Sequence, residues 1–501
     1  MAFFPSTLRA SRTLPASRGP DGEVFSHDRR QLCQLSFRHV IERTVFPCLL
    51  ALTLPAAAQP AQPTAYQRAI AAGYKALTLC SAIFVAGRTQ EQAEALELTG
   101  IYPEYDAIVP TLQATVNGLR GRVVVPYDPT MPPRIAKAGP GIGCTVEPIG
   151  AVEPPEIGDV HDPTPSPPNT EPDPRPWPLG DAGIAPRPSR ALEELAVRAF
   201  DGASFGAGSR TVAVAVVRDG RLVAEHYAAG FGPFVPNRTW SVAKSIAGTL
   251  VGIAVREGAA DVAGPAAIPE WNPRASVDPR AGITLDNLLR MSSGLHGATP
   301  GNRTDAVYFG GTAVTEETVA WPLAALPGKR FRYANNDILL ALRALRHALG
   351  EDRYRWFPKA ELFDPIGMTR TVAEQDWLGN YVLSSQVWST ARDLARLGQL
   401  WLDDGIWQGR RILPEGWMRY MTTPGGPQPS ENGGVGYGAT LWLFGPAQGL
   451  PEGSYSAQGN RGQYVMVIPS RRLVVVRRGE DRGGAPFDIA KFTAEVLEAL
   501  E

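Results

Sequence analysis

The sequence has no long uncharged apolar run, almost no net charge and no metal-binding pattern. No eighteen consecutive residues are apolar and uncharged, so we expect no membrane span. The formal net charge of −1 argues against nucleic-acid binding, because that function usually needs a basic face. The six histidines form no HExxH or HxH arrangement, and the four cysteines form no zinc or CxxC pattern. We therefore expect no metal site and no cofactor.

Residues 1–60 have the features of a signal or leader segment, removed or disordered in the working protein. The apolar stretch 45–54 is followed by small residues, as in a signal-peptide core and its cleavage site. It lies far from residue 1, so it is a long leader, a segment preceding the true start, or a disordered tail with an apolar patch. We expect an exported protein, periplasmic or secreted, with a cytoplasmic location as the alternative. Export would leave Cys80 and Cys144, which favours a disulfide over two buried thiols.

Proline indicates the main boundary in the chain. Many of the 46 prolines fall within 150–190, where they exclude a helix or a central strand. We predict a linker there, or a belt that wraps over the next domain. Residues 65–150 are expected to form a small N-terminal domain with a helix near 67–79, and residues 190–501 the main domain.

The order of patterns after residue 190 predicts the fold class. Two hairpins are expected, one over 211–227 with an Asp-Gly turn signal and one over 463–476. Helices are expected at both ends, over 190–200 and 488–500, and helical patterns fill the region between the hairpins. This order predicts an α+β fold. One antiparallel sheet, built from distant chain segments, would be flanked by helices and would carry an inserted helical lobe.

The strongest chemical signal is segment 239–246, TWSVAKSI, at the start of a predicted helix. Ser241 and Lys244 are three residues apart, so their side chains share one helix face. A serine hydroxyl needs a base to become a good nucleophile, and a lysine can act as one when burial and the helix dipole lower its pKa. The pair is a candidate nucleophile and base. Alone, the S-x-x-K match also fits an N-terminal serine beside a solvated lysine.

A second segment, 327–337 with the sequence PGKRFRYANND, could complete the site. In extended geometry Tyr333 and Asn335 would point the same way, and Asn336 or Asp337 would cap the following helix. A tyrosinate beside a lysinium can act as a base and later as an acid. The asparagine amide could bind substrate or hold the lysine. The alternative is a core tyrosine followed by a capping asparagine.

The third segment, 457–465 with the sequence AQGNRGQYV, is predicted to begin an edge strand. Its glycines would let a substrate backbone come close. One of its backbone N–H groups, paired with that of Ser241, could form an oxyanion hole. The alternative is a glycine-rich turn.

In this order the three segments resemble those of class C β-lactamases, penicillin-binding DD-peptidases and related esterases and amide hydrolases. Segments 288–295, LLRMSSGL, and 362–368, LFDPIGM, also resemble landmarks of that family, as does 389–395. The resemblance covers about 190–501. Around Ser241 the sequence is most similar to 6-aminohexanoate-dimer hydrolase and its esterase-like relatives.

The resemblance implies a β-lactamase/transpeptidase-like fold and a serine hydrolase that acts on a small-molecule ester or amide. Ser241 would be acylated, Lys244 and Tyr333 would shuttle the proton, and water would then release the acyl group. The backbone N–H of the residue after Gly459 would belong to the oxyanion hole. The resemblance thus assigns supporting or substrate-binding roles to Asn335, Gly459 and Asn460.

One departure from the family bears on the substrate. Its β-lactamases and DD-peptidases carry Lys-Thr-Gly on the third strand, where this chain has Ala457-Gln458-Gly459. Without that cation a substrate carboxylate loses a partner, which favours esters or amides, although Arg461 could supply a charge from a different position. β-Lactamase or DD-peptidase activity and a non-catalytic binding module stay as alternatives.

Two weaker signals complete the sequence picture. Segment 202–206 matches GxSxG, the nucleophile elbow of α/β-hydrolases. An elbow follows a strand and opens a helix, whereas this segment follows a predicted helix and precedes a strand. Tyr308 and Trp442 are candidates to line the acyl pocket, or ordinary core residues. The sequence itself sets no oligomeric state.

Overall fold

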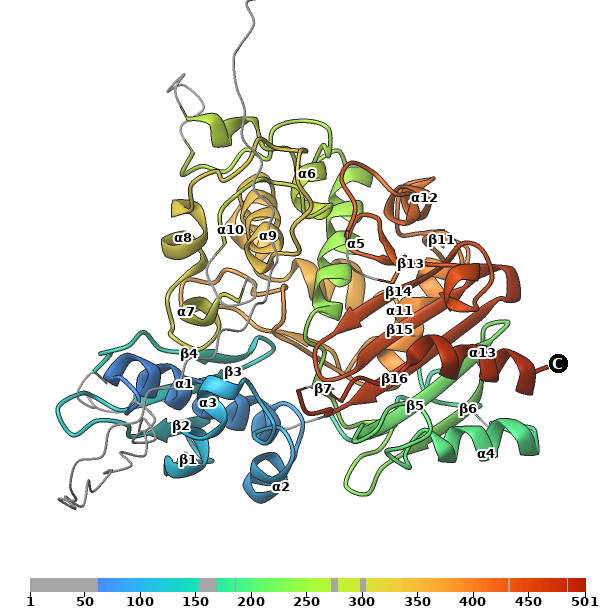
Figure 1. Cartoon of the computed structure of the whole chain (residues 1–501), viewed down its shortest axis with the longest axis horizontal. Helices are drawn as coiled ribbons and strands as arrows, with labels where there is room; N and C mark the ends of the chain where they lie inside the picture. The colour runs from blue at the N-terminus through green and yellow to red at the C-terminus, as the bar shows by residue number, and fades with distance from the viewer. Residues whose placement is uncertain are drawn as a thin grey trace, which may run out of the picture. The chain divides into compact units, whose positions relative to one another are not determined.

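The computed structural model describes residues 62–152, 169–184, 186–271, 278–297, 303–430, 433–483 and 485–501. The expected leader, with Cys33 and Cys48, lies outside these ranges, as do residues 153–168 of the proline-rich segment. From Gln62 onward the chain belongs to one unit, coloured from blue to red in Figure 1. Within the described ranges, no helix is both long enough and apolar enough to span a bilayer.

The main domain is built on a seven-stranded antiparallel sheet with the order β12-β13-β14-β15-β16-β5-β6. Its strands are β5 (Thr211–Arg218), β6 (Arg221–Tyr227), β12 (Gly436–Tyr437), β13 (Trp442–Phe444), β14 (Ser454–Gly459), β15 (Gln463–Ile468) and β16 (Leu473–Gly479). Both predicted hairpins are present, and β16 joins them by pairing with β5, for example Val475 with Val216. The predicted α+β fold, with one sheet built from distant segments, is confirmed.

Helices cover both faces of this sheet (Figure 1). Along β5, Val214 and Val216 face one hydrophobic cluster while Ala215 and Val217 face another, as the two-residue period of a strand requires. The first cluster contains residues of α4 (Arg190–Arg198) and α13 (Ile489–Ala499), and the second contains residues of α5 (Val242–Arg256) and α11 (Ala391–Leu402).

The helical lobe is inserted between β6 and β12. Its helices include α6 (Leu285–Leu289), α7 (Asp305–Tyr308), α8 (Val314–Glu317), α9 (Asn335–Leu349) and α10 (Glu351–Tyr354). The hairpin of β10 (Ile406–Trp407) with β11 (Arg410–Arg411) and the helix α12 (Trp417–Thr422) follow α11.

The start of α9 differs from the prediction. The helix begins at Asn335 with Ala334 as its N-cap, so the prediction that Asn336 or Asp337 caps it is wrong. Both residues are buried in its first turn. The Asp337 carboxylate accepts a hydrogen bond from the Ser293 hydroxyl at 2.8 Å, so a tertiary partner replaces the local capping role.

The segment before the proline-rich region packs its long helix α1 (Ala65–Phe84) against a four-stranded antiparallel sheet. Its other elements are α2 (Gln90–Ala95), α3 (Pro103–Asp106), β1 (Thr115–Asn117), β2 (Arg122–Val125), β3 (Arg134–Gly139) and β4 (Gly143–Val146). Its hydrophobic cluster also includes main-domain residues such as Trp240 and Phe309. Cys80 and Cys144 form the disulfide favoured by the sequence, which ties α1 to β4.

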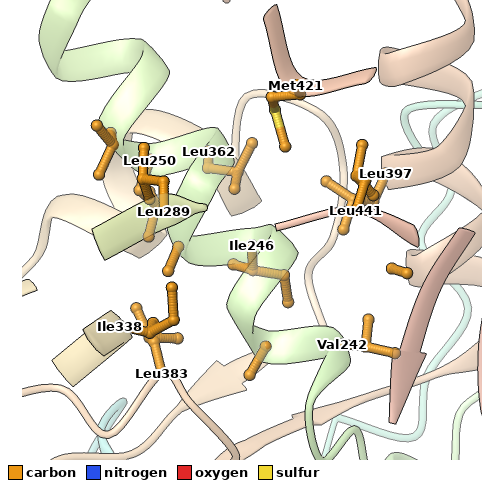
Figure 2. Close-up of a cluster of buried hydrophobic side chains, with 14 of the residues drawn as sticks. Val242, Ile246, Leu250, Leu289, Ile338, Leu362, Leu383, Leu397, Met421 and Leu441 are labelled. Carbon is orange, nitrogen blue, oxygen red and sulfur yellow. The ribbon is translucent and has the colours of Figure 1, made fainter. Parts of the chain in front are cut away.

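Helix α5 is anchored in the main core by its buried apolar side chains. Val242, Ile246 and Leu250 are fully buried, and Figure 2 shows them among side chains from several other elements. The labelled neighbours include Leu289, Ile338, Leu383, Leu397 and Leu441. This packing holds the first turn of α5, with its serine and lysine, in a rigid setting.

Candidate active site

The backbone around Ser241 presents its side chain at the start of α5. The strand β7 (Asn237–Arg238), paired with β9 (Val387–Ser389), leads into Trp240, whose φ of +51° lies in the left-handed region. That conformation costs a tryptophan about 1–3 kcal/mol and is often found at functional sites. Ser241 is the N-cap of α5, yet its side chain makes no capping hydrogen bond. Its hydroxyl is therefore available to other partners.

Lys244 is the main partner of that hydroxyl. Its amine donates to Ser241 Oγ at 2.8 Å, to Asn335 Oδ1 at 2.8 Å and to the Ser384 carbonyl at 2.7 Å. The lysine is only 1% exposed, so the alternative of a solvated lysine is wrong. Burial lowers the pKa of its amine to about 7, because a charged group loses hydration in the interior. The amine is thus poised to gain or lose a proton near neutral pH.

Tyr333 lies beside the same pair. The Lys244 Nζ is 5.0 Å from the centroid of its ring, and the tyrosine side chain hydrogen-bonds with Ser241. Burial raises the pKa of its phenol, and the hydrogen bond with Ser241 only partly offsets that rise. Trp442 and Tyr437 pack against its ring, with centroids 5.4 Å and 6.1 Å away. The phenol is therefore held in place and carries its proton at neutral pH.

Gly459 lies at the end of β14, directly against the nucleophile's backbone. A Cβ atom there would lie 2.3 Å from the Thr239 carbonyl oxygen and 3.0 Å from the Ser241 nitrogen, so only glycine permits this approach. Asn460 follows at the tip of the hairpin and lines the same cavity as Ser241. The prediction that this segment begins an edge strand is wrong, because β14 and β15 are inner strands and 460–462 is the turn between them.

These groups border a cavity of about 270 Å³. It is lined by Tyr102, Trp240, Ser241, Arg303, Tyr308, Tyr333, Asn335, Ser385 and Asn460. Four of the predicted residues, Ser241, Tyr333, Asn335 and Asn460, therefore share one cavity, and Lys244 contacts two of them from the buried side. Tyr308 lines the cavity, as considered from the sequence, and its hydroxyl forms a 2.6 Å hydrogen bond with Ser384 Oγ. Trp442 contributes indirectly, through Tyr333.

Arg461 does not bring a cation into the cavity. Its guanidinium is buried and donates to the Glu480 carboxylate and to the carbonyls of Leu96, Thr99 and Gly100. Its predicted alternative role, as a substitute for the missing lysine of the third strand, is not the one it has here.

The GxSxG segment makes no nucleophile elbow. Ser204 lies between α4 and β5, and its hydroxyl donates to the Asp201 carboxylate. The structure thus has helix, turn and strand where the elbow needs strand, turn and helix.

In the described part of the chain, no group of three histidine, cysteine, aspartate or glutamate residues is placed to hold a metal ion.

Sequence reasoning missed four contributors, which are Ser384, Ser385, Tyr102 and Arg303. Ser384 accepts the Lys244 hydrogen bond through its backbone carbonyl, which no side-chain pattern reveals, although it stands just before the recognised segment 389–395. Tyr102 and Arg303 reach the cavity from regions without any recognisable motif. Their roles depend on long-range packing, so the sequence offered no local signal for them.

Comparison with known proteins identifies the family of the main domain. The family model described as Beta-lactamase matches residues 196–499. A 6-aminohexanoate-dimer hydrolase from Paenarthrobacter ureafaciens is 28% identical over 332 residues, which cover 59% of this chain and 79% of that protein.

Two solved structures are similar to this chain at lower sequence identity. A family VIII carboxylesterase has a TM-score of 0.51 at 16% identity, over 63% of this chain and 98% of the esterase. A penicillin-binding protein homologue from Caulobacter crescentus has a TM-score of 0.49 at 17% identity, over 63% of this chain and 98% of the homologue. The family match spans more than half of the chain, and it includes the segments of Ser241, Tyr333 and Gly459. The chain therefore belongs to the beta-lactamase family of serine hydrolases.

Proposed function

We propose that this protein hydrolyses carboxylic esters or amides through an acyl-enzyme on Ser241, with Lys244 and Tyr333 moving the proton. The observation that carries the proposal is the buried Lys244 amine, 2.8 Å from a serine hydroxyl that borders an open cavity. A lysine with a pKa near 7 can be neutral at physiological pH and accept the serine proton.

The first half of the reaction would form the acyl-enzyme. Ser241 Oγ attacks the substrate carbonyl carbon while its proton passes to the neutral Lys244 amine. The resulting oxyanion is stabilised by the backbone N–H groups of Ser241 and Asn460, which the close approach of Gly459 to Ser241 supports. As the carbon–leaving group bond breaks, Tyr333 donates its proton to the leaving group and recovers one from the Lys244 ammonium.

The second half would reverse these roles. Water attacks the acyl carbonyl, its proton passes to Lys244, and Ser241 Oγ leaves with a proton returned through the same pair. Atoms balance as one ester or amide plus one water, giving a carboxylic acid and an alcohol or amine. Asn335 would hold the Lys244 amine in place in both halves, which its 2.8 Å hydrogen bond supports.

The substrate class follows from two observations. Ala457-Gln458-Gly459 brings no cation to the third strand. Arg461, two residues further on, is buried and bonded to carbonyl groups and Glu480, so a carboxylate substrate lacks its usual partner there. The amide option rests on the 6-aminohexanoate-dimer hydrolase relative. Esters or amides are thus preferred to β-lactams and D-alanyl acids.

We further propose that the protein works in an oxidising compartment outside the cytoplasm. The Cys80–Cys144 disulfide supports this, because cytosolic thiols are normally kept reduced. Fusing residues 1–70 to a reporter that is active only after export tests it. A fusion that stays inactive and cytoplasmic would overturn the proposal.

The decisive experiment measures p-nitrophenol release from the acetate and butyrate esters by the wild type and by Ser241→Ala. We expect turnover by the wild type and a loss of about a thousandfold or more in the variant, as removal of a catalytic group usually gives. Ser204→Ala is the matched control, because it removes the GxSxG serine and should leave the rate unchanged. A fluorophosphonate probe should label the wild type and the control at Ser241.

Other outcomes have definite meanings. Turnover that survives Ser241→Ala would remove that residue as the nucleophile. Hydrolysis of a penicillin at rates above those of both esters would favour the β-lactamase alternative. Absence of both turnover and probe labelling in the wild type would favour the non-catalytic binding module.

A further inference from the structure

The N-terminal segment reaches the candidate active site, although it lies outside the family match at 196–499. Tyr102, at the N-cap of the short helix α3, is one of the residues that line the cavity containing Ser241. The other aromatic residues of the lining, Trp240, Tyr308 and Tyr333, all come from the main domain. One wall of the cavity thus belongs to a segment that lies outside the residues matched by the family model.

The ring of Tyr102 is held by neighbours on several sides. It meets Trp240 edge to face with centroids 6.1 Å apart, and the Arg303 guanidinium lies 4.2 Å from its centroid. Tyr74 of α1 makes a further edge contact at 6.2 Å. Arg303 also pairs with Glu104 on α3, two residues after Tyr102. A ring held in this way acts as a fixed surface, which is what discrimination by size requires.

Arg461 anchors the chain that leads to Tyr102. Its guanidinium donates to the carbonyls of Leu96, Thr99 and Gly100 at 2.9–3.1 Å, and to Glu480 at 2.7 Å. The charged guanidinium is buried, so it makes these hydrogen bonds away from bulk water. Arg461 follows Asn460 directly and has a φ of +58°, so its backbone is also in an unusual conformation. The anchor therefore connects the N-terminal segment to the hairpin tip that borders the cavity.

We propose that the N-terminal segment is a working part of the active site, in which Tyr102 limits the size of the substrate group that fits and Arg461 fixes the position of that wall. This rests on the proposed function, because it concerns the substrate of the same cavity. The group that contacts Tyr102 meets an aromatic face with the Arg303 guanidinium beside it, and four aromatic rings line the cavity in all. At about 270 Å³, the cavity is small enough for the loss of one phenol ring to change what fits.

The experiment compares Tyr102→Ala, which enlarges the cavity, with Tyr102→Trp, which narrows it. For each protein, kcat/KM is measured with p-nitrophenyl octanoate and acetate, and in a second series with 1-naphthyl and p-nitrophenyl acetate. In each series we divide kcat/KM for the larger ester (octanoate or 1-naphthyl) by kcat/KM for the smaller one. We expect this ratio to rise about tenfold or more in Tyr102→Ala and to fall in Tyr102→Trp, in at least one series. The ratio does not depend on the fraction of folded protein, so poor folding cannot imitate the result.

Three further variants complete the design. Tyr102→Phe keeps the ring and should keep the wild-type ratio. Tyr66→Ala removes an exposed tyrosine of the same segment, outside the cavity lining, and should also keep it. Arg461→Met should shift the ratio in the same direction as Tyr102→Ala, because the wall loses its anchor.

Ratios that stay at the wild-type value in both Tyr102→Ala and Tyr102→Trp, in both series, would overturn the role of Tyr102. An Arg461→Met variant with lower activity but an unchanged ratio would overturn the anchoring role. Fluorophosphonate labelling of Ser241 separates these failures from failure of the proposed function. Labelling with unchanged ratios means that only the inference is wrong, whereas a wild type without labelling or turnover means that the proposed function itself is wrong.

Discussion

The Lys244 amine donates to Asn335 Oδ1 at 2.8 Å, across 91 residues of sequence. With Ser241 Oγ and the Ser384 carbonyl as its other acceptors, this bond fixes the amine beside the candidate nucleophile. The burial that holds the Lys244 amine in this position also lowers its pKa to about 7. Position and protonation of Lys244 are therefore two results of one packing arrangement, and each can be tested.

The pH dependence of hydrolysis should report the protonation of Lys244. A lysine whose pKa is lowered to about 7 is charged below that pH and cannot accept the Ser241 proton. We expect kcat/KM for p-nitrophenyl acetate to rise with pH through an apparent pKa near 7 and to level off above it. A stopped-flow or plate-reader profile checks this. A rate that is flat through that region, or that rises near the usual pKa of a carboxylate, would contradict the role of Lys244.

Asn335→Asp should shift this profile to higher pH. A carboxylate in hydrogen-bond contact favours the ammonium form of Lys244 and raises the pKa of its amine. We expect a shift of about one pH unit or more in the acidic limb, with lower activity at pH 7. Asn335→Ala is the control, because it removes the hydrogen bond without adding charge and should not move the acidic limb to higher pH. An unchanged limb in Asn335→Asp would show that the profile reports another group.

Tyr333→Phe tests the proton donor while keeping the ring. The phenylalanine ring preserves the packing against Trp442 and Tyr437, but no proton can reach the leaving group through it. We expect kcat to fall by about a hundredfold to ten-thousandfold, the usual contribution of general acid–base catalysis. Poor leaving groups should suffer most, so an alkyl ester should lose more than p-nitrophenyl acetate. Tyr437→Phe is the control, and an equal loss in it would point to packing as the cause.

Loss of the disulfide should destabilise the protein. The Cys80–Cys144 bond closes a loop of 64 residues, so the double variant Cys80→Ser/Cys144→Ser should lose up to about 4 kcal/mol of unfolding free energy by the chain-entropy estimate. Thermal unfolding with and without a reductant measures this. Reductant should lower the Tm of the wild type toward that of the double variant and leave the variant unchanged. Equal Tm values for both proteins under oxidising conditions would contradict the prediction.

Some parts of this site could be predicted because they are local. Ser241 and Lys244 are three residues apart on one helix, so the 3.6-residue period alone puts them together once Val242 and Ile246 indicate that helix. The hairpins were predictable for the same reason, since a turn signal and a two-residue alternation fix the pairing of neighbouring strands. Local geometry also predicts the class of chemistry, because a serine and a lysine at this spacing can exchange a proton.

Other parts were decided only by the tertiary structure. The cap of α9 and the expected edge strand were wrong, because Asp337 found a distant partner in Ser293 and the sheet added strands outside β14 and β15. Such choices depend on what packs alongside a segment, which its own residues do not encode.

The sequence by itself determined the nucleophile helix, the fold class and the order of the motifs, because these follow from periodicity and from short spacings. Only the tertiary structure decided that the Ser384 carbonyl binds Lys244, that Arg461 points to the N-terminal segment and that Tyr102 lines the cavity. Each of these contacts joins residues more than a hundred positions apart. These contacts form only when the whole core is packed, so no short sequence pattern predicts them.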